Sequence, residues 1–291
     1  MIATKQNPTP ASNRRTRQTP LSFDTTANSA APLIAGDHHW QWMEYANDEE
    51  RSWLFRWPDT NSLERHLRFL DRVGEVYRPL PTRRHDQTSL VGTTEKLAPL
   101  SALDLQGASL PRIKSLFESL GRWLRNLHDI PAPPGFGDVG QESSFHTFNA
   151  FMAENFRILG IRLRALDSDV VRDQSVQVLA ALRNELSAFH PHGRSAWTVG
   201  RLTPSRIAVS TEQYRVVGVL DFGAAALRPP EYDIASLRIH RIFGEHLAAE
   251  RAFWSGYGAA RTCDLKRRIT YFERLIELEH LLDRPAHLPS T

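Results

Sequence analysis

The chain has 291 residues, of which 41% are hydrophobic and 9% aromatic, enough for a substantial core in one two-lobed unit or two modest domains. The formal net charge of +3 is small and scattered, so the composition gives no indication of nucleic-acid binding. No apolar run approaches the roughly 20 residues that would span a bilayer, which argues against a membrane protein. The N-terminus lacks a signal-peptide pattern and Cys263 is the single cysteine, so we expect a cytoplasmic protein. The basic residues are almost all arginine, which we attribute to GC-rich codon usage in a bacterial genome.

The first segment, residues 1–35, is rich in Thr, Asn, Pro, Ser and Ala. Such a composition cannot bury enough apolar surface to offset the entropy lost on ordering. We therefore predict a disordered tail over 1–35.

The next part of the chain, residues 36–97, is predicted to form a small β-rich lobe. Apolar and polar residues alternate over 40–45, a polar turn follows, and residues 52–57 have the composition of a returning strand, a pattern typical of a hairpin. A helix is expected to follow the N-cap candidates of 58–61 and to end at Gly74, with further short strands around residues 76–77 and 90–91. The apolar residues that share one face of this helix are Leu63, Leu67, Leu70 and Val73.

The remainder, residues 98–291, is predicted to be a larger helical lobe. Apolar residues at three-and-four spacing predict helices over 110–130, 144–166 and 168–189, followed by short strands within 197–220. Helices resume at about Asp233, and we expect this residue to be the N-cap of the helix that it opens. The fold class is therefore α+β.

Two segments carry a family resemblance. An apolar strand ends in Asp221-Phe222-Gly223, and Pro-x-Tyr-Asp-Ile-Ala follows at residues 230–235. This pair resembles a stretch of the aminoglycoside phosphotransferase and choline kinase family, which has a two-lobed protein-kinase-like fold.

The second segment, residues 199–207, resembles the family's catalytic loop, which reads H-G-D-L-H-P-G-N-I. The resemblance places Arg201 at the position of the catalytic aspartate and Arg206 at that of the metal-binding asparagine. The residues that match are Gly200, Leu202, Pro204 and Ile207.

The resemblance also implies cofactor-binding roles. Arg56 lies where the family has a phosphate-contacting lysine, and Glu64 lies where a glutamate would pair with it, although both could form an ordinary surface pair. Glu95 and Leu97 belong to a segment similar to the hinge that holds adenine, and Asp221 corresponds to a metal ligand.

Phosphoryl transfer in this fold needs a metal ion held by the DFG aspartate and an asparagine, and an aspartate that takes the acceptor proton. Arginine cannot act as a base near neutral pH, and its guanidinium repels a divalent cation. We therefore expect Arg201 or Arg206 to pair with Asp221 in place of Mg²⁺. Two alternatives stay open for the cofactors: none, or ATP with Mg²⁺.

Three functions follow as alternatives. The first is a pseudokinase that binds a ligand, a peptide or a partner protein in or near the interlobe cleft, with an anionic ligand favoured over a cationic aminoglycoside. The second is an active ATP-dependent phosphotransferase with an atypical loop, in which His190, His192 or Asp221 serves as the base. The third is a structural subunit of a biosynthetic or peptide-modifying complex, which a large exposed apolar patch would favour.

Overall fold

The structure is a computed structural model, and the chain divides into the units Met1–Ala30 and Ala31–Thr291. All elements below belong to the second unit. The predicted tail lies outside the described residues except for its last three, which belong to the first strand. The described residues are 33–37, 40–47, 50–74, 82–93, 97–139, 145–166, 168–188, 195–244 and 246–283.

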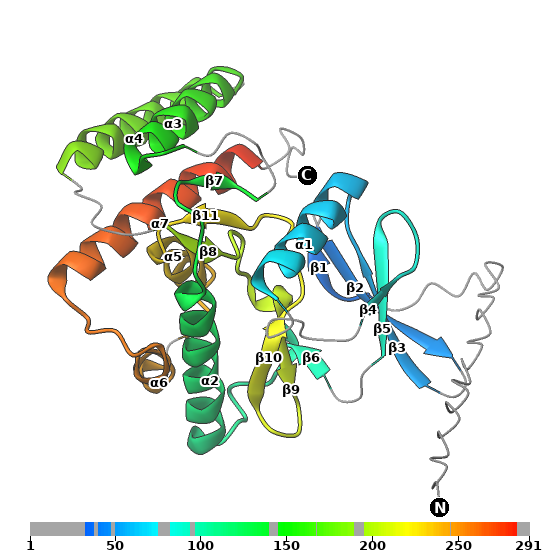
Figure 1. Cartoon of the computed structure of the whole chain (residues 1–291). Helices are drawn as coiled ribbons and strands as arrows, with labels where there is room; N and C mark the ends of the chain where they lie inside the picture. Colours follow the sequence, from blue (N-terminus) through cyan, green and yellow to red (C-terminus); the bar gives the residue numbers. More distant parts are fainter. Residues whose placement is uncertain are drawn as a thin grey trace, which may run out of the picture. The chain divides into compact units, whose positions relative to one another are not determined.

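The first elements form an antiparallel sheet of five strands in the order β1-β2-β3-β5-β4 (Figure 1). The predicted hairpin is confirmed, since β2 pairs with β3 from Gln41 opposite Arg56 to Asn47 opposite Glu50. The strands are β1 (Leu33–Asp37), β2 (Trp40–Asn47), β3 (Glu50–Arg56), β4 (Thr82–Arg84) and β5 (Ser89–Thr93).

Helix α1 (Thr60–Val73) follows β3 and begins and ends where the sequence predicts. The side chain of its N-cap, Asp59, accepts a hydrogen bond from the Ser62 N–H at 2.7 Å, and Gly74 ends the helix with a φ of 80°. The predicted apolar face is only partly correct, because His66 and Phe69 are buried whereas Leu67 is half-buried.

The rest of the chain is mainly helical. Two small sheets with the orders β10-β9-β6 and β7-β11-β8 lie among the helices. The helices are α2 (Leu110–Asp129), α3 (Phe148–Arg164), α4 (Asp169–Ala188), α5 (Glu231–Ile239), α6 (Leu247–Tyr257) and α7 (Cys263–Asp283), with short 3-10 turns η2 (Leu100–Ala102) and η3 (Pro204–Arg206). The strands are β6 (Leu97–Pro99), β7 (Gly137–Asp138), β8 (Ala196–Thr198), β9 (Ile207–Ser210), β10 (Arg215–Val219) and β11 (Ala226–Arg228). No helix among the described residues is long and apolar enough to cross a membrane.

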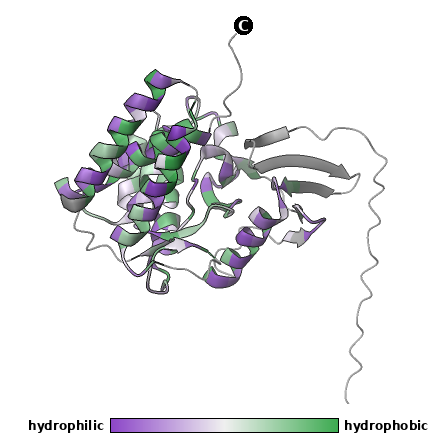
Figure 2. Cartoon of the chain, turned by 90° about the horizontal axis from the view of Figure 1, so that it is seen from above, coloured by the Kyte–Doolittle hydropathy of each residue, from purple (hydrophilic) through white to green (hydrophobic). Residues whose placement is uncertain are grey.

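The main hydrophobic core lies among these helices, which carry both apolar and polar residues along their lengths (Figure 2). Phe222 is fully buried in it and stacks on Phe69 of α1, with ring centroids 4.4 Å apart. This contact joins α1 to the segment that carries Asp221, and so positions the site described next.

Candidate functional site

Asp233 of α5 anchors the loop that precedes η3. The Asp233 carboxylate is fully buried and accepts hydrogen bonds from the backbone N–H groups of Val199 at 2.8 Å and Gly200 at 3.0 Å. His128 Nε2 lies 3.2 Å from the same carboxylate. The prediction that Asp233 is a helix N-cap is therefore wrong. Asp233 lies inside the first turn of α5, whose N-cap is Pro230, and it fixes the neighbouring loop instead.

Gly200 lets this loop approach the segment after Asp221 very closely. Its φ is 86°, and a Cβ atom there would lie 2.0 Å from the Ala224 carbonyl oxygen. Any side chain would push the two segments apart. The glycine thus keeps the loop that leads to Arg206 beside Asp221.

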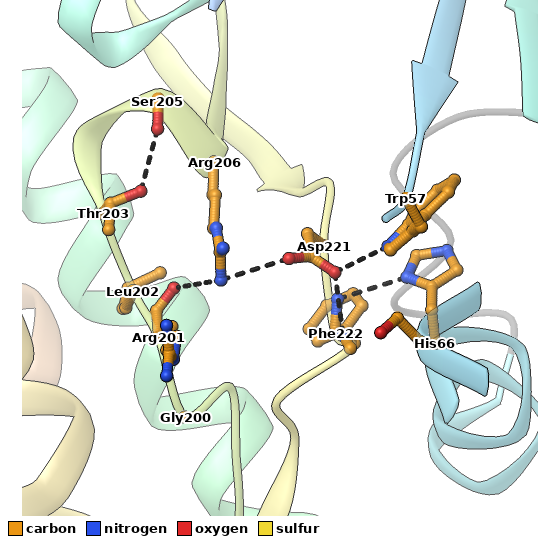
Figure 3. Close-up of polar contacts among 12 residues, drawn as sticks. Trp57, His66, Gly200, Arg201, Leu202, Thr203, Ser205, Arg206, Asp221 and Phe222 are labelled. Atoms are coloured by element: carbon orange, nitrogen blue, oxygen red, sulfur yellow. Dashed lines mark hydrogen bonds and ion pairs between the residues drawn. The ribbon is translucent and has the colours of Figure 1, made fainter. Parts of the chain in front are cut away.

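Asp221 is buried, and three donors of the chain itself engage its carboxylate (Figure 3). Trp57 donates its indole N–H to Oδ1 at 2.7 Å, and the Gly223 backbone N–H donates to the same oxygen at 2.7 Å. Arg206 Nη1 lies 3.1 Å from Oδ2. The prediction that an arginine pairs with Asp221 is confirmed for Arg206.

Arg206 is itself buried, with a side-chain exposure of 1%. Its Nη1 also donates to the carbonyl oxygen of Arg201 at 3.1 Å, so the guanidinium joins the loop to Asp221. A divalent cation at Asp221 would have to share the carboxylate with this buried positive charge. The residues present therefore do not fit Mg²⁺, which needs free carboxylate oxygens around it.

Arg201 does not reach Asp221 as its ion-pair partner. Its Nη2 contacts Asp283, the last residue of α7, and Arg162 of α3 donates to the other oxygen of Asp283 at 2.6 Å. Burial alone would raise the pKa of Asp283, but hydrogen bonds and charge from the two arginines outweigh burial and lower it. Arg201 is thus bound through Asp283 to the end of α7.

His66 of α1 faces this centre, which the sequence analysis did not foresee. The Phe222 N–H donates to His66 Nδ1 at 3.2 Å, and the imidazole lies 4.7 Å from the Trp57 ring. Burial lowers the pKa of His66 to about 4, although the charge of Asp221 opposes the effect. A signal was present in the sequence, because Ser62, His66 and Phe69 follow helical spacing.

Of the residues expected to bind a nucleotide with Asp221, the three described ones, Arg56, Glu64 and Leu97, line neither cavity beside it. Arg56 is exposed at the end of β3, because the next residue, Trp57, faces the core and successive residues of an extended chain face opposite sides. Glu64 pairs with Arg84 at 2.8 Å instead of with Arg56. Leu97 packs in the apolar cluster that includes Trp57, and Glu95 lies outside the described residues.

Two cavities adjoin the centre, and both are lined by Arg65, Arg201 and Ala224. The first has a volume of about 260 Å³ and is also lined by Trp57, Pro58, Asp59, Ser62, Arg206, Asp221 and Gly223. The second has a volume of about 320 Å³ and is also lined by Asp138, Asn155, Ile158, Leu159, Arg162, Gly200, Arg228, Tyr232, Glu279 and Asp283.

The first cavity offers no good candidate for a general base among the described residues. Besides Asp221, its lining includes one carboxylate, Asp59, which already accepts from Ser62 N and Oγ. The hydrogen bond from the Ser62 backbone lowers the pKa of Asp59, which makes it a weaker base. His190 and His192 lie outside the described residues. Among the described residues, no group of three or more His, Cys, Asp or Glu side chains could hold a metal ion.

A family model described as the phosphotransferase enzyme family matches residues 45–265. Among solved structures, the chain is similar to the aminoglycoside phosphotransferase APH(3'')-Id from Streptomyces rimosus, with 19% identity, a TM-score of 0.57, and coverage of 87% of this chain and 93% of that one. A thermostable mutant of aminoglycoside phosphotransferase APH(4)-Ia has a TM-score of 0.64 at 12% identity, with coverage of 87% and 86%. A macrolide 2'-phosphotransferase type I has a TM-score of 0.58 at 16% identity, with coverage of 86% and 84%. A search among curated proteins gave no significant match. The structural similarity establishes the kinase-like α+β fold.

Proposed function

Because this chain belongs to the phosphotransferase enzyme family, we propose that it is a member that has lost Mg²⁺-dependent phosphoryl transfer and acts by binding. Its ligand is a small molecule, a peptide or a partner protein that occupies the region around Asp221. The observation that carries the proposal is the buried ion pair between Arg206 and Asp221.

The ion pair supports the loss of the metal in two ways. Arg206 neutralises Asp221, so the carboxylate no longer needs a metal ion to offset its charge in a buried place. The remaining oxygen of Asp221 accepts from Trp57 and Gly223, so it is also engaged. A metal at Asp221 would have to compete with a buried arginine that already pairs with the carboxylate.

The residue expected to take the proton of the phosphate acceptor supports the same conclusion. The catalytic-base position holds Arg201, which pairs with Asp283 and cannot accept a proton near neutral pH. Restoring activity would thus need two changes, one at each arginine.

Exposed apolar residues give little support to the alternative of a structural subunit. The large apolar residues that are exposed in the described part of the chain lie on four different helices. They are Leu110, Ile158, Ile161, Val170, Val176 and Leu247.

The experiment is thermal unfolding of the full chain with ATP, with Mg²⁺, and with both, followed by an assay for transfer of the γ-phosphate of ATP. We expect Mg²⁺ to cause no shift alone and to add none to any shift caused by ATP. The double variant Arg201→Asp/Arg206→Asn is the matched control, in which an Mg²⁺-dependent shift should appear. A shift in the natural chain that requires Mg²⁺, or phosphate transfer by it, would contradict the proposal.

A further inference from the structure

Arg65 of α1 lines both cavities next to Asp221 and makes no ion pair with any described residue. Its Nη2 donates to Ser62 Oγ at 3.3 Å, and its Nε is buried with no hydrogen-bond partner among the described residues. A guanidinium carries five N–H donors, so most of its capacity is unused. A buried donor without a partner calls for an explanation, and a bound ligand group beside Arg65 would supply one.

The acidic residues around the cavities, by contrast, are already engaged by the chain. Asp59 accepts from Ser62, and Asp283 accepts from Arg162 and contacts Arg201. Glu279 accepts a hydrogen bond from the Tyr232 hydroxyl at 2.7 Å. Asp138 lies 3.9 Å from Arg228. A cationic ligand would therefore compete with donors of the chain for each of these carboxylates.

The distribution of charge in the second cavity points the same way. Its lining includes four arginines and three carboxylates, which leaves an excess of one positive charge. Two of the arginines, Arg162 and Arg201, share the single carboxylate of Asp283. Arg65, one of these four arginines, forms no ion pair with a described carboxylate of the cavity. An anion placed beside Arg65 would offset this excess.

An apolar wall completes the second cavity. Ile158 and Leu159 of α3 line it, and Ile158 keeps 42% of its surface exposed. A ligand that covers Ile158 would remove apolar surface from water, which favours binding.

From these observations we infer that the two cavities form a binding site for an oxyanion, a carboxylate or a phosphate, attached to an apolar group. The oxyanion accepts hydrogen bonds from Arg65, and the apolar group packs against Ile158. The inference rests on the proposed binding function and names the chemistry of the ligand.

The test measures dissociation constants, by isothermal titration calorimetry, for three probes with the same ring: benzoate, phenyl phosphate and benzylamine. We expect at least one of the two anions to bind and benzylamine not to bind; the tighter anion identifies the head group. Arg65→Gln should weaken anion binding roughly tenfold or more, because it removes a charge-assisted hydrogen bond. Arg65→Lys keeps the charge but loses the planar guanidinium, so its affinity for the anion should lie between those of the natural chain and of Arg65→Gln.

Matched controls come from the same helices. Arg68→Gln changes an exposed arginine of α1 that lines neither cavity, and it should leave the affinity unchanged. Ile158→Asn should weaken binding, whereas Ile161→Asn, at an exposed position of α3 outside the lining, should not.

Three results would overturn the inference: binding of none of the probes, equal binding of benzylamine, or unchanged affinity in Arg65→Gln. None of them would restore Mg²⁺-dependent phosphate transfer, so the anion site can fail while the proposed loss of catalysis stands. Conversely, phosphate transfer by the natural chain would refute the proposed function whatever the probes show.

Discussion

At the scale of single residues, Arg206 and Asp221 form a buried ion pair. Burying two charges is costly, so such a pair contributes little net stability compared with apolar residues. Removing one partner is different, because it leaves the other charge buried without compensation. Single substitutions at this pair should thus be more harmful than the matched double substitution.

We expect Arg206→Met to lower the free energy of unfolding by about 3–5 kcal/mol, because Asp221 would remain charged and buried. Urea titration of the natural chain and the variant measures the difference. The control is Arg206→Met/Asp221→Asn, which removes both charges and should be more stable than Arg206→Met. Equal stability of the two variants would mean that the pair is not coupled.

His66 should make stability depend on pH. Burial lowers the pKa of His66 to about 4 in the folded protein, from 6.5 in the unfolded chain. The unfolded state therefore takes up a proton first. The contribution of neutral His66 is complete above pH 6.5 and is lost as the pH falls from 6.5 towards 4, and it amounts to about 3 kcal/mol.

The measurement is the free energy of unfolding between pH 4 and 8 for the natural chain, His66→Gln and His146→Gln. We expect His66→Gln to flatten the fall below pH 6.5. His146 is exposed, so His146→Gln should keep the full pH dependence. A steep fall that persists in His66→Gln would assign the effect to other groups.

At the scale of elements, the packing of α2 on α6 depends on two glycines. A Cβ atom on Gly121 would lie 2.1 Å from the Phe253 carbonyl oxygen, and one on Gly256 would lie 2.0 Å from the Glu118 carbonyl oxygen. Both contacts are with backbone, which cannot yield without moving a helix. Close approach of the helices, rather than backbone flexibility, is thus what the two glycines provide.

We expect Gly121→Ala to lower the melting temperature and the free energy of unfolding, by about 1–3 kcal/mol, because α2 and α6 must separate. Gly160→Ala is the matched control on α3. A Cβ there would approach Arg183 and Leu179 no closer than 3.7 Å, so the change should raise stability by roughly 0.5–1 kcal/mol through helix propensity. A stabilising Gly121→Ala would show that the two helices can adjust without cost.

At the scale of the whole molecule, local sequence predicted most of the fold but only part of the site. Short-range patterns predict the hairpin and α1 with its Asp59 and Gly74 caps. The pairing of Arg206 with Asp221 follows from two segments that lie close together in the sequence. Local patterns do not predict two contacts with distant elements. Arg201 contacts Asp283, which lies 82 positions away, and Asp221 accepts from Trp57, which lies 164 positions away.

The errors have the same physical origin. Asp233 was assigned to its own helix because N-capping is a local interaction, yet its acceptors serve a loop 33 and 34 positions earlier. The resemblance predicts that Glu64 pairs with Arg56, but the rotation of α1 turns His66 towards Phe222 and leaves Glu64 to pair with Arg84. The rotation of a helix depends on tertiary packing, which one sequence does not reveal.

The central claim is that Arg206 excludes a divalent cation from Asp221, and titration with Mn²⁺ followed by electron paramagnetic resonance tests it most directly. Mn²⁺ takes the same oxygen ligands as Mg²⁺, and its free signal falls when it binds. We expect the natural chain to bind no Mn²⁺ at this site and Arg206→Asn to bind one ion, which Arg206→Asn/Asp221→Asn loses. A single Mn²⁺ bound by the natural chain and lost in Asp221→Asn would contradict the claim.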